Sequence, residues 1–187
     1  NDEGAPTDKG GYHMFGITEW EDLESAVKYT LTRGAKNINL VGHSMGGAIV
    51  LKFLLESKLS SQITKVILES PALDLNRIIS AKAATLPFPA SVVLLPVKKI
   101  VSKIVGFSWS ELNYLKNTNK YNVPILLIHS ETDDTVPIIL SDEFAVSRPD
   151  IIEYVRLNDA PHAAAWNVHK NRIEKSIEKF LLRSHQK

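Results

Sequence analysis

The hydrophobic pattern of this sequence changes repeatedly between the period of a helix and the short continuous runs that are typical of buried strands. The apolar runs predict strands at 38–41, 66–68, 125–128 and 154–157. Helical spacing between and after them predicts helices over about 18–33, 46–56 and 139–146, and an amphipathic helix near the end of the sequence. Because continuously apolar strands that alternate with helices belong to parallel sheets, we predict an α/β fold, a mostly parallel sheet flanked by helices.

The predicted helix over 18–33 has recognisable ends. Thr18 lies three residues before Glu21, which is the spacing of a capping box, where side chains bond the free N–H groups of the first turn. Gly34 follows the last turn, and a glycine there commonly takes the left-handed conformation that ends a helix. We therefore expect Thr18 to cap this helix and Gly34 to terminate it.

The length of 187 residues fits a single domain with a substantial core, which we predict to cover 1–187. The segment of about 80–119 interrupts the alternation, because it is first punctuated by prolines and then amphipathic. We predict that it is a small helical insertion over one edge of the sheet. Residues 86–97 form the most apolar stretch, but it is too short and too rich in proline to cross a bilayer, so no integral membrane segment is expected.

Charge and composition exclude several functions. Lys and Arg number 22 and Asp and Glu number 21, for a net charge of +1, so the chain has no basic field that would hold a nucleic acid. The sequence has no cysteine, which excludes disulfides, thiolate catalysis and cysteine-ligated metals. It also lacks a clustered metal-ligand pattern and a phosphate-binding glycine loop, so we expect no metal and no organic cofactor.

The segment Gly42-His43-Ser44-Met45-Gly46 has the pattern G-x-S-x-G between a predicted strand and a predicted helix. A serine at such a sharp turn has a strained backbone, and glycines on both sides relieve the crowding and expose its hydroxyl. The first N–H groups of the following helix point to the place where an oxyanion would develop. Ser44 is therefore a candidate nucleophile, and the alternative is a structural turn with an idle serine.

A nucleophilic serine needs a general base and an acid that orients this base. In folds of this type, the acid and then the base come from loops at the carboxyl ends of later strands. The loop after the third predicted strand offers Asp133, with Asp134 and Glu131 as alternatives. The loop after the fourth offers His162, whose alternative role is that of a turn residue, whereas we expect His129 to be a buried structural residue.

Three ordered motifs resemble the α/β-hydrolase superfamily over nearly the whole chain. They are GHSMGG at 42–47, HSETD at 129–133 followed by VP at 136–137, and PHAAAW at 161–166. Residues 1–6 and 15–23 are also similar to bacterial members near the esterase-like and prolyl-oligopeptidase-like branches. The resemblance implies that Ser44 is the nucleophile, Asp133 the orienting acid and His162 the general base, with the backbone N–H of Met45 in the oxyanion hole.

The resemblance also favours Asp133 over Asp134, because the acid of the family follows the histidine of this motif by four residues. Ser130 stands where the motif usually has a glycine, which is a mild departure. The implied function is hydrolysis of a small-molecule ester or amide through an acyl-enzyme. The alternatives are a non-catalytic scaffold of the same fold and, among enzymes, a transferase or a haloperoxidase-like use of the triad.

The resemblance covers only the second part of such a hydrolase. The first strands of the family, and the loop that supplies another oxyanion donor, have no counterpart here, so we expect the sequence to be a fragment or a part of a longer protein. Loss of one oxyanion donor lowers turnover by about a hundredfold to a thousandfold. The predicted strand at 38–41 would be an exposed apolar edge, and pairing of two such edges into a homodimer would cover it.

The resemblance further makes residues of about 80–119 a cap over Ser44. We expect Phe88 and Trp109 in this cap, and Trp166 in the last motif, to contact an apolar part of the substrate. The alternative is that these aromatic side chains only pack the cap and the core.

Overall fold

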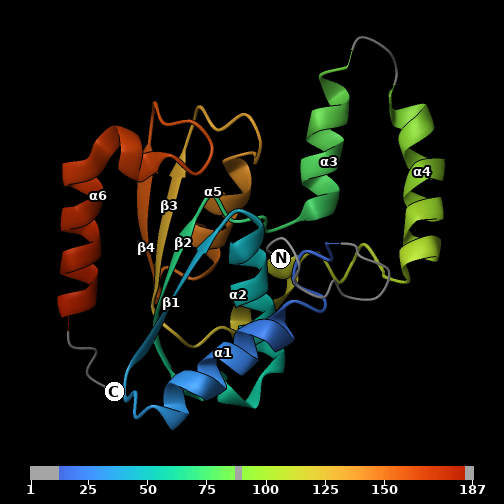
Figure 1. Cartoon of the computed structure of the whole chain (residues 1–187). Coiled ribbons are helices and arrows are strands. Elements are labelled where there is room, and N and C mark those ends of the chain that lie inside the picture. The colour runs from blue at the N-terminus through green and yellow to red at the C-terminus, as the bar shows by residue number, and fades with distance from the viewer. Residues whose placement is uncertain (1–12, 87–89, 184–187) are drawn as a thin grey trace.

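The computed structural model describes residues 13–86 and 90–183 of the chain. Its centre is a parallel sheet of four strands in the order β1-β2-β3-β4 (Figure 1). The strands are β1 (Ile38–His43), β2 (Ile63–Glu69), β3 (Ile125–Ser130) and β4 (Ile152–Leu157). The predicted α/β fold with a parallel sheet is confirmed. Each strand is longer than its apolar run, because backbone hydrogen bonds continue the ladder through polar residues.

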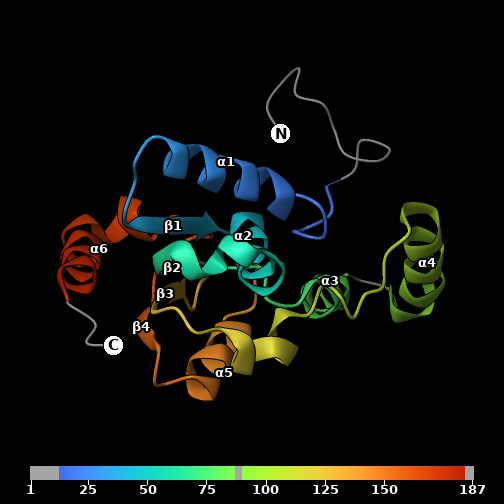
Figure 2. The same cartoon turned by 90° about the horizontal axis from the view of Figure 1, so that it is seen from below.

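Helices cover both faces of the sheet (Figures 1 and 2). One face carries α2 (Met45–Glu56) and α5 (Ile139–Ser147), and α1 (Trp20–Thr32) packs on α2. The opposite face carries α6 (Ala165–Leu182). Because alternate residues of a strand point to opposite faces, β2 and β3 supply apolar side chains to a separate core on each side.

The first helix, α1, begins at Trp20 and lacks the predicted capping box. The carboxylate of Glu19 accepts the N–H groups of Met14 and Gly16 and so closes the turn that precedes the helix. The hydroxyl of Thr18 is buried without a hydrogen-bond partner among the described residues. The prediction for Thr18 is therefore wrong, whereas Gly34 has a φ of 88° and ends the helix as predicted.

The chain between β2 and β3 contains α3 (Leu75–Ala84), α4 (Ala90–Val105) and the 3₁₀ helix η2 (Tyr114–Lys120). Both views show α3 and α4 standing beside the sheet, with α4 farthest from it (Figures 1 and 2). Many apolar side chains of α4 are exposed, among them Val92 at 71% and Leu95 at 69%. Nevertheless, none of the described helices is long and apolar enough to cross a membrane.

Strand β1 is an edge strand of the described sheet, because it pairs with β2 alone. Its inward-facing residues are buried, whereas Val41 on the other face is 57% exposed. An apolar side chain is thus uncovered next to the unpaired edge. The pairing of this edge in a homodimer stays a prediction.

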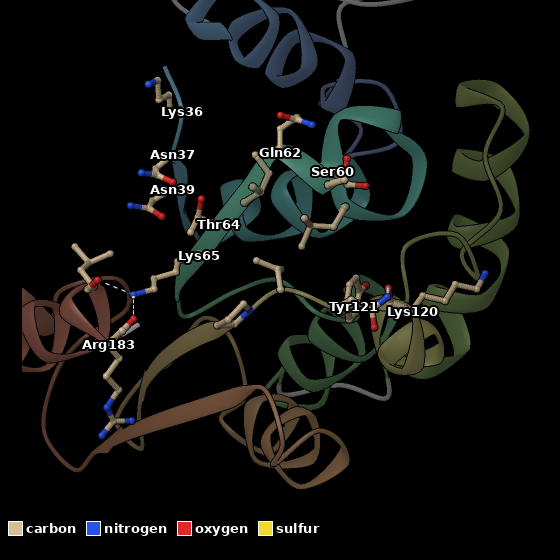
Figure 3. Close-up of a pocket in the computed structure, with 17 residues that line it drawn as sticks. Lys36, Asn37, Asn39, Ser60, Gln62, Thr64, Lys65, Lys120, Tyr121 and Arg183 are labelled. Carbon is tan, nitrogen blue, oxygen red and sulfur yellow. Dashed lines mark hydrogen bonds between the residues drawn. The ribbon is translucent and has the colours of Figure 1, made fainter. Parts of the chain in front are cut away.

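Strand β2 is attached to the carboxyl end of α6 through the buried Lys65. Its ammonium donates to the carbonyls of Phe180, Leu181 and Arg183, at distances of 2.7, 2.6 and 2.7 Å. Figure 3 shows the bonds to Leu181 and Arg183. Carbonyls at the end of a helix lack partners within the helix and carry the negative end of its dipole, so a cation is well suited to them. Lys65 therefore fixes this end of α6 to the sheet.

Replacement of Lys65 tests this attachment. We expect Lys65→Met to lower the free energy of unfolding by about 1–3 kcal/mol, because carbonyls at the helix end lose their donor. Chemical denaturation followed by circular dichroism measures the change. Lys58→Met is the matched control at an exposed lysine and should stay within about 0.5 kcal/mol of the wild type. Equal destabilisation by both variants would contradict the role given to Lys65.

Candidate active site

The predicted catalytic residues lie at one edge of the sheet. The last residue of β1 pairs with the last residue of β2, and the last residue of β3 pairs with that of β4, so the loops that follow the parallel strands leave the sheet on the same side. Ser44 follows β1, Asp133 lies in the loop after β3, and His162 lies in the loop after β4. Ligands of open α/β sheets bind at this carboxyl edge, which agrees with the placement predicted for the three residues.

Ser44 occupies the turn between β1 and α2. Its φ of 50° and ψ of −116° place it in a strained conformation, of the kind that costs about 1–3 kcal/mol and persists only where the surroundings fix it. Its N–H donates to the carbonyl of Glu69, and its own carbonyl accepts the N–H groups of Gly47 and Ala72. Met45 is the first residue of α2, so its N–H is one of the free donors of the helix.

The glycines around Ser44 have different surroundings. A Cβ atom at Gly42 would lie 2.7 Å from the carbonyl oxygen of Gly46, and one at Gly47 would lie 2.6 Å from Cβ of Pro71. In contrast, a Cβ atom at Gly46 would meet nothing within 4 Å. The expectation that glycines on both sides of the serine relieve crowding is therefore correct for Gly42 and wrong for Gly46, because the start of α2 brings Gly47 into the close contact.

This difference predicts opposite effects of two alanine substitutions. Gly42→Ala should destabilise the fold by about 1–3 kcal/mol, because its methyl group meets backbone atoms that cannot move freely. Gly46→Ala is the matched control and should be neutral or stabilising by up to about 1 kcal/mol, because the space is open and alanine favours the helix. Denaturant unfolding measures both variants, and equal destabilisation would contradict the packing described here.

Asp133 and His162 are in direct contact. His162 Nδ1 donates to Asp133 Oδ2 at 2.8 Å, and the Asp133 side chain is fully buried while that of His162 is 21% exposed. Because Nδ1 donates, the neutral imidazole has its lone pair on Nε2, which can accept a proton. No hydrogen bond joins Ser44 to His162 within the described part of the chain, so the pairing of serine and base stays a prediction.

Several further donors hold the Asp133 carboxylate. Oδ1 accepts the N–H groups of Thr135 and Val136, both at 2.9 Å. Oδ2 accepts from His129 Nε2 at 3.1 Å. His129 Nε2 also contacts the carbonyl of Val136. Because a carbonyl can only accept, Nε2 carries the proton, and Nδ1 of the neutral ring therefore accepts from the Ser141 hydroxyl. His129 is buried as predicted, and it also fixes the orientation of the candidate acid.

Burial and hydrogen bonding have opposite effects on the pKa of Asp133. Burial by itself would raise the pKa, but the hydrogen bonds, above all those from His129 and from the Val136 N–H, outweigh it. They hold the pKa well below the usual range of an aspartate. The carboxylate is therefore charged at neutral pH and is able to orient and stabilise a protonated imidazole.

The lowered pKa predicts how stability depends on pH. Since the pKa of Asp133 is lower in the folded than in the unfolded chain, its carboxylate adds stability above about pH 4, and this stability is lost as the pH falls towards the folded-state pKa. Asp133→Asn removes the contribution. The difference in unfolding free energy between wild type and variant should be largest near neutral pH and shrink below about pH 4. Denaturant titrations at several pH values measure it, and a constant difference would refute the assignment.

The two described aromatic residues that were expected in the substrate site bond to other partners. Trp109 is half-buried, and its Nε1 donates to the Lys98 carbonyl of α4 at 3.1 Å. Trp166 is 46% exposed in the first turn of α6, where its Nε1 donates to Glu174 at 3.2 Å. Phe88 lies outside the described residues.

The two alternative acids make other contacts. Asp134 is exposed and accepts the hydroxyl of Thr135 at 3.0 Å. Glu131 is also exposed and pairs with Arg156 on β4. Neither carboxylate bonds His162 in the described ranges, and among the three acids only Asp133 does.

Backbone strain and a buried acid also characterise this edge. Ser70 and Ala163, which follow β2 and β4, have φ values of 45° and 51°, as Ser44 does at 50°.

Glu69, the last residue of β2, is 6% exposed and was not among the predicted site residues. An acidic residue directly after an uninterrupted apolar run is the sequence signal that could have indicated it.

The described residues also form a cavity of about 890 Å³ at the opposite edge of the sheet, near the amino ends of the strands (Figure 3). Its lining is mixed, with apolar side chains such as Leu54 and Val123 beside the cationic residues Lys36, Lys65, Lys120 and Arg183. None of the predicted site residues lines it.

Across 13–86 and 90–183, no group of three or more His, Asp or Glu side chains is arranged to hold a metal ion.

The parallel sheet, the serine turn after β1 and the aspartate–histidine contact between later loops together define an α/β-hydrolase fold. Residues 18–113 match the model of the serine aminopeptidase family S33. The match covers slightly more than half of the sequence, and the chain belongs to this family of α/β hydrolases.

Solved structures share the fold. An esterase from Pyrococcus furiosus is 24% identical, with a TM-score of 0.68 over 92% of this chain and 64% of the esterase. A bromoperoxidase from Bacillus anthracis is 18% identical, with a TM-score of 0.60 over 94% of this chain and 77% of that one. The chain thus spans less than two thirds of the esterase, and at these identities the likeness concerns the fold alone. No curated protein matches the sequence.

Proposed function

We propose that this chain is a serine hydrolase that cleaves a carboxylic ester or amide of a small molecule, with Ser44, Asp133 and His162 as its triad. The proposal depends above all on the hydrogen bond between Asp133 and His162 at the edge where the strained turn of Ser44 lies. Membership of the S33 family supports it, and so does the fold shared with a solved esterase.

The proposed reaction forms an acyl-enzyme and then hydrolyses it. Ser44 Oγ attacks the carbonyl carbon while His162 Nε2 takes the hydroxyl proton, and the Met45 N–H donates to the oxyanion. The imidazolium gives the proton to the leaving alcohol or amine, the C–O or C–N bond breaks, and the acyl group stays on Ser44. Water, deprotonated by His162, then attacks the acyl-enzyme, and the acid and the free serine are released.

The segment of about 80–119 acts in this proposal as a cap that receives the apolar part of the substrate. The exposed apolar side chains of α4 support this role, because they are not used to pack the segment onto the sheet. Trp109 attaches to α4 through the Lys98 carbonyl and would shape the cap, together with Phe88. Trp166, four residues after His162, would form a wall on the other side.

Labelling and turnover test the triad together. A fluorophosphonate probe should label the wild type and not Ser44→Ala, because the probe reacts with an activated serine hydroxyl. His162→Ala should stay folded and lose p-nitrophenyl acetate turnover. Asp133→Asn should lower turnover by about 10³–10⁴-fold, whereas Asp134→Asn, at an exposed neighbour, should stay close to the wild type.

The alternative function is a non-catalytic scaffold of the same fold. A folded wild-type sample that neither reacts with the probe nor turns over the ester would favour the scaffold and overturn the proposed activity. A larger loss in Asp134→Asn than in Asp133→Asn would transfer the acid role to Asp134.

A further inference from the structure

The side chain of Glu69 connects the two loops that the proposed chemistry has to hold together. Oε2 pairs with Nδ1 of His43, the residue before Ser44, at 2.8 Å. Oε1 accepts the N–H of Ala165, three residues after His162, at 2.7 Å. One buried carboxylate thus contacts a direct neighbour of the proposed nucleophile and the end of the loop that carries the proposed base.

The backbone of Glu69 adds a third connection. Its carbonyl accepts the N–H of Ser44 at 3.0 Å, so the residue is bonded to the serine turn through both its main chain and its side chain. Glu69 ends β2, an inner strand that is bonded to β1 on one side and to β3 on the other. The position of Glu69 in the sheet therefore fixes the position of the Ser44 turn.

On the other side, Glu69 holds a loop that has little freedom of its own. The Ala164 N–H donates to the Pro161 carbonyl at 3.1 Å, and Ala163 has a φ of 51°, so the segment around His162 is a tight, strained turn. Ala165 is the first residue of α6, and a carboxylate is stabilised at the positive end of a helix. The contact therefore fixes both the start of α6 and the end of the His162 turn.

We propose that Glu69 is a positioning residue, which sets the separation between the Ser44 hydroxyl and the His162 imidazole by tying the serine turn to the start of α6. The inference rests on the proposed function. A buried carboxylate must keep its donors, and the two donors of Glu69 come from these two loops. Without the tie, each loop can shift, and a displacement of reacting groups by about 1 Å costs about a hundredfold in rate.

Substitution of Glu69 tests the tie through kcat and KM. Glu69→Leu keeps the size but removes the acceptor oxygens, and it should lower kcat for p-nitrophenyl acetate by about a hundredfold while KM changes little. Glu69→Gln should restore most of kcat, because its amide oxygen still accepts the Ala165 N–H and its amide group can donate to His43. Glu153→Leu is the matched control: it removes an ion-paired glutamate near the amino end of β4 and should keep the wild-type kcat.

Denaturant unfolding gives the folded fraction of each variant, and kcat is expressed per folded molecule, so a smaller folded fraction does not imitate the effect. A wild-type kcat in Glu69→Leu, or equal losses in the Leu and Gln variants, would overturn the positioning role. If Glu69→Leu does not fold, Glu69→Met, with similar length and no acceptor oxygen, takes its place. A wild type without Ser44-dependent turnover would instead overturn the proposed function, and this inference with it.

Discussion

The buried carboxylate of Asp133 is the constraint around which the carboxyl edge of the sheet is organised. A charge removed from water is stable only where donors surround it, and Asp133 receives them from its own loop, from His129 and from His162. Meeting this requirement draws the loop after β4 onto the loop after β3. The arrangement that allows the fold to bury a negative charge therefore also holds the imidazole of His162 in the orientation that the proposed proton transfer needs.

Strain and close packing at this edge have a common origin. The chain leaves a strand at Ser44 and at Ser70 and turns into α6 just after Ala163, and each of these sharp changes of direction coincides with a positive φ. Close packing at Gly42 and Gly47 leaves the serine turn no room to relax. The strained conformations thus persist because the sheet and the first turn of α2 determine the path of the backbone on both sides.

The strands and the edge that carries the candidate acid and base could be predicted, because continuous apolar runs mark buried strands and parallel strands end on the same side. Other features depend on geometry that no local pattern contains. Thr18 has the spacing of a cap, but Glu19 bonds the preceding turn and the helix starts beyond it. Gly46 has open space around it and Gly47 is closely packed, and this difference depends on the direction in which α2 leaves the turn. Glu69 accepts a hydrogen bond from the backbone N–H of Ala165, which is 96 positions away in the sequence. Because any residue could supply this N–H, the side chain at 165 gives no sign of the contact.

The α6 helix is held at both ends by β2, with Glu69 at its amino end and Lys65 at its carboxyl end. Opposite charges at the two ends match the helix dipole, but the helix is not straight, because His169 has a non-helical φ of −120° and ψ of 42° and kinks α6 near its first turn. The kink separates the short first turn, which Glu69 holds, from the longer segment whose carboxyl end Lys65 holds. A disturbance near Arg183 would therefore be absorbed by bending at His169 before it reached the loop of His162, so the two ends of the helix are mechanically insulated from each other.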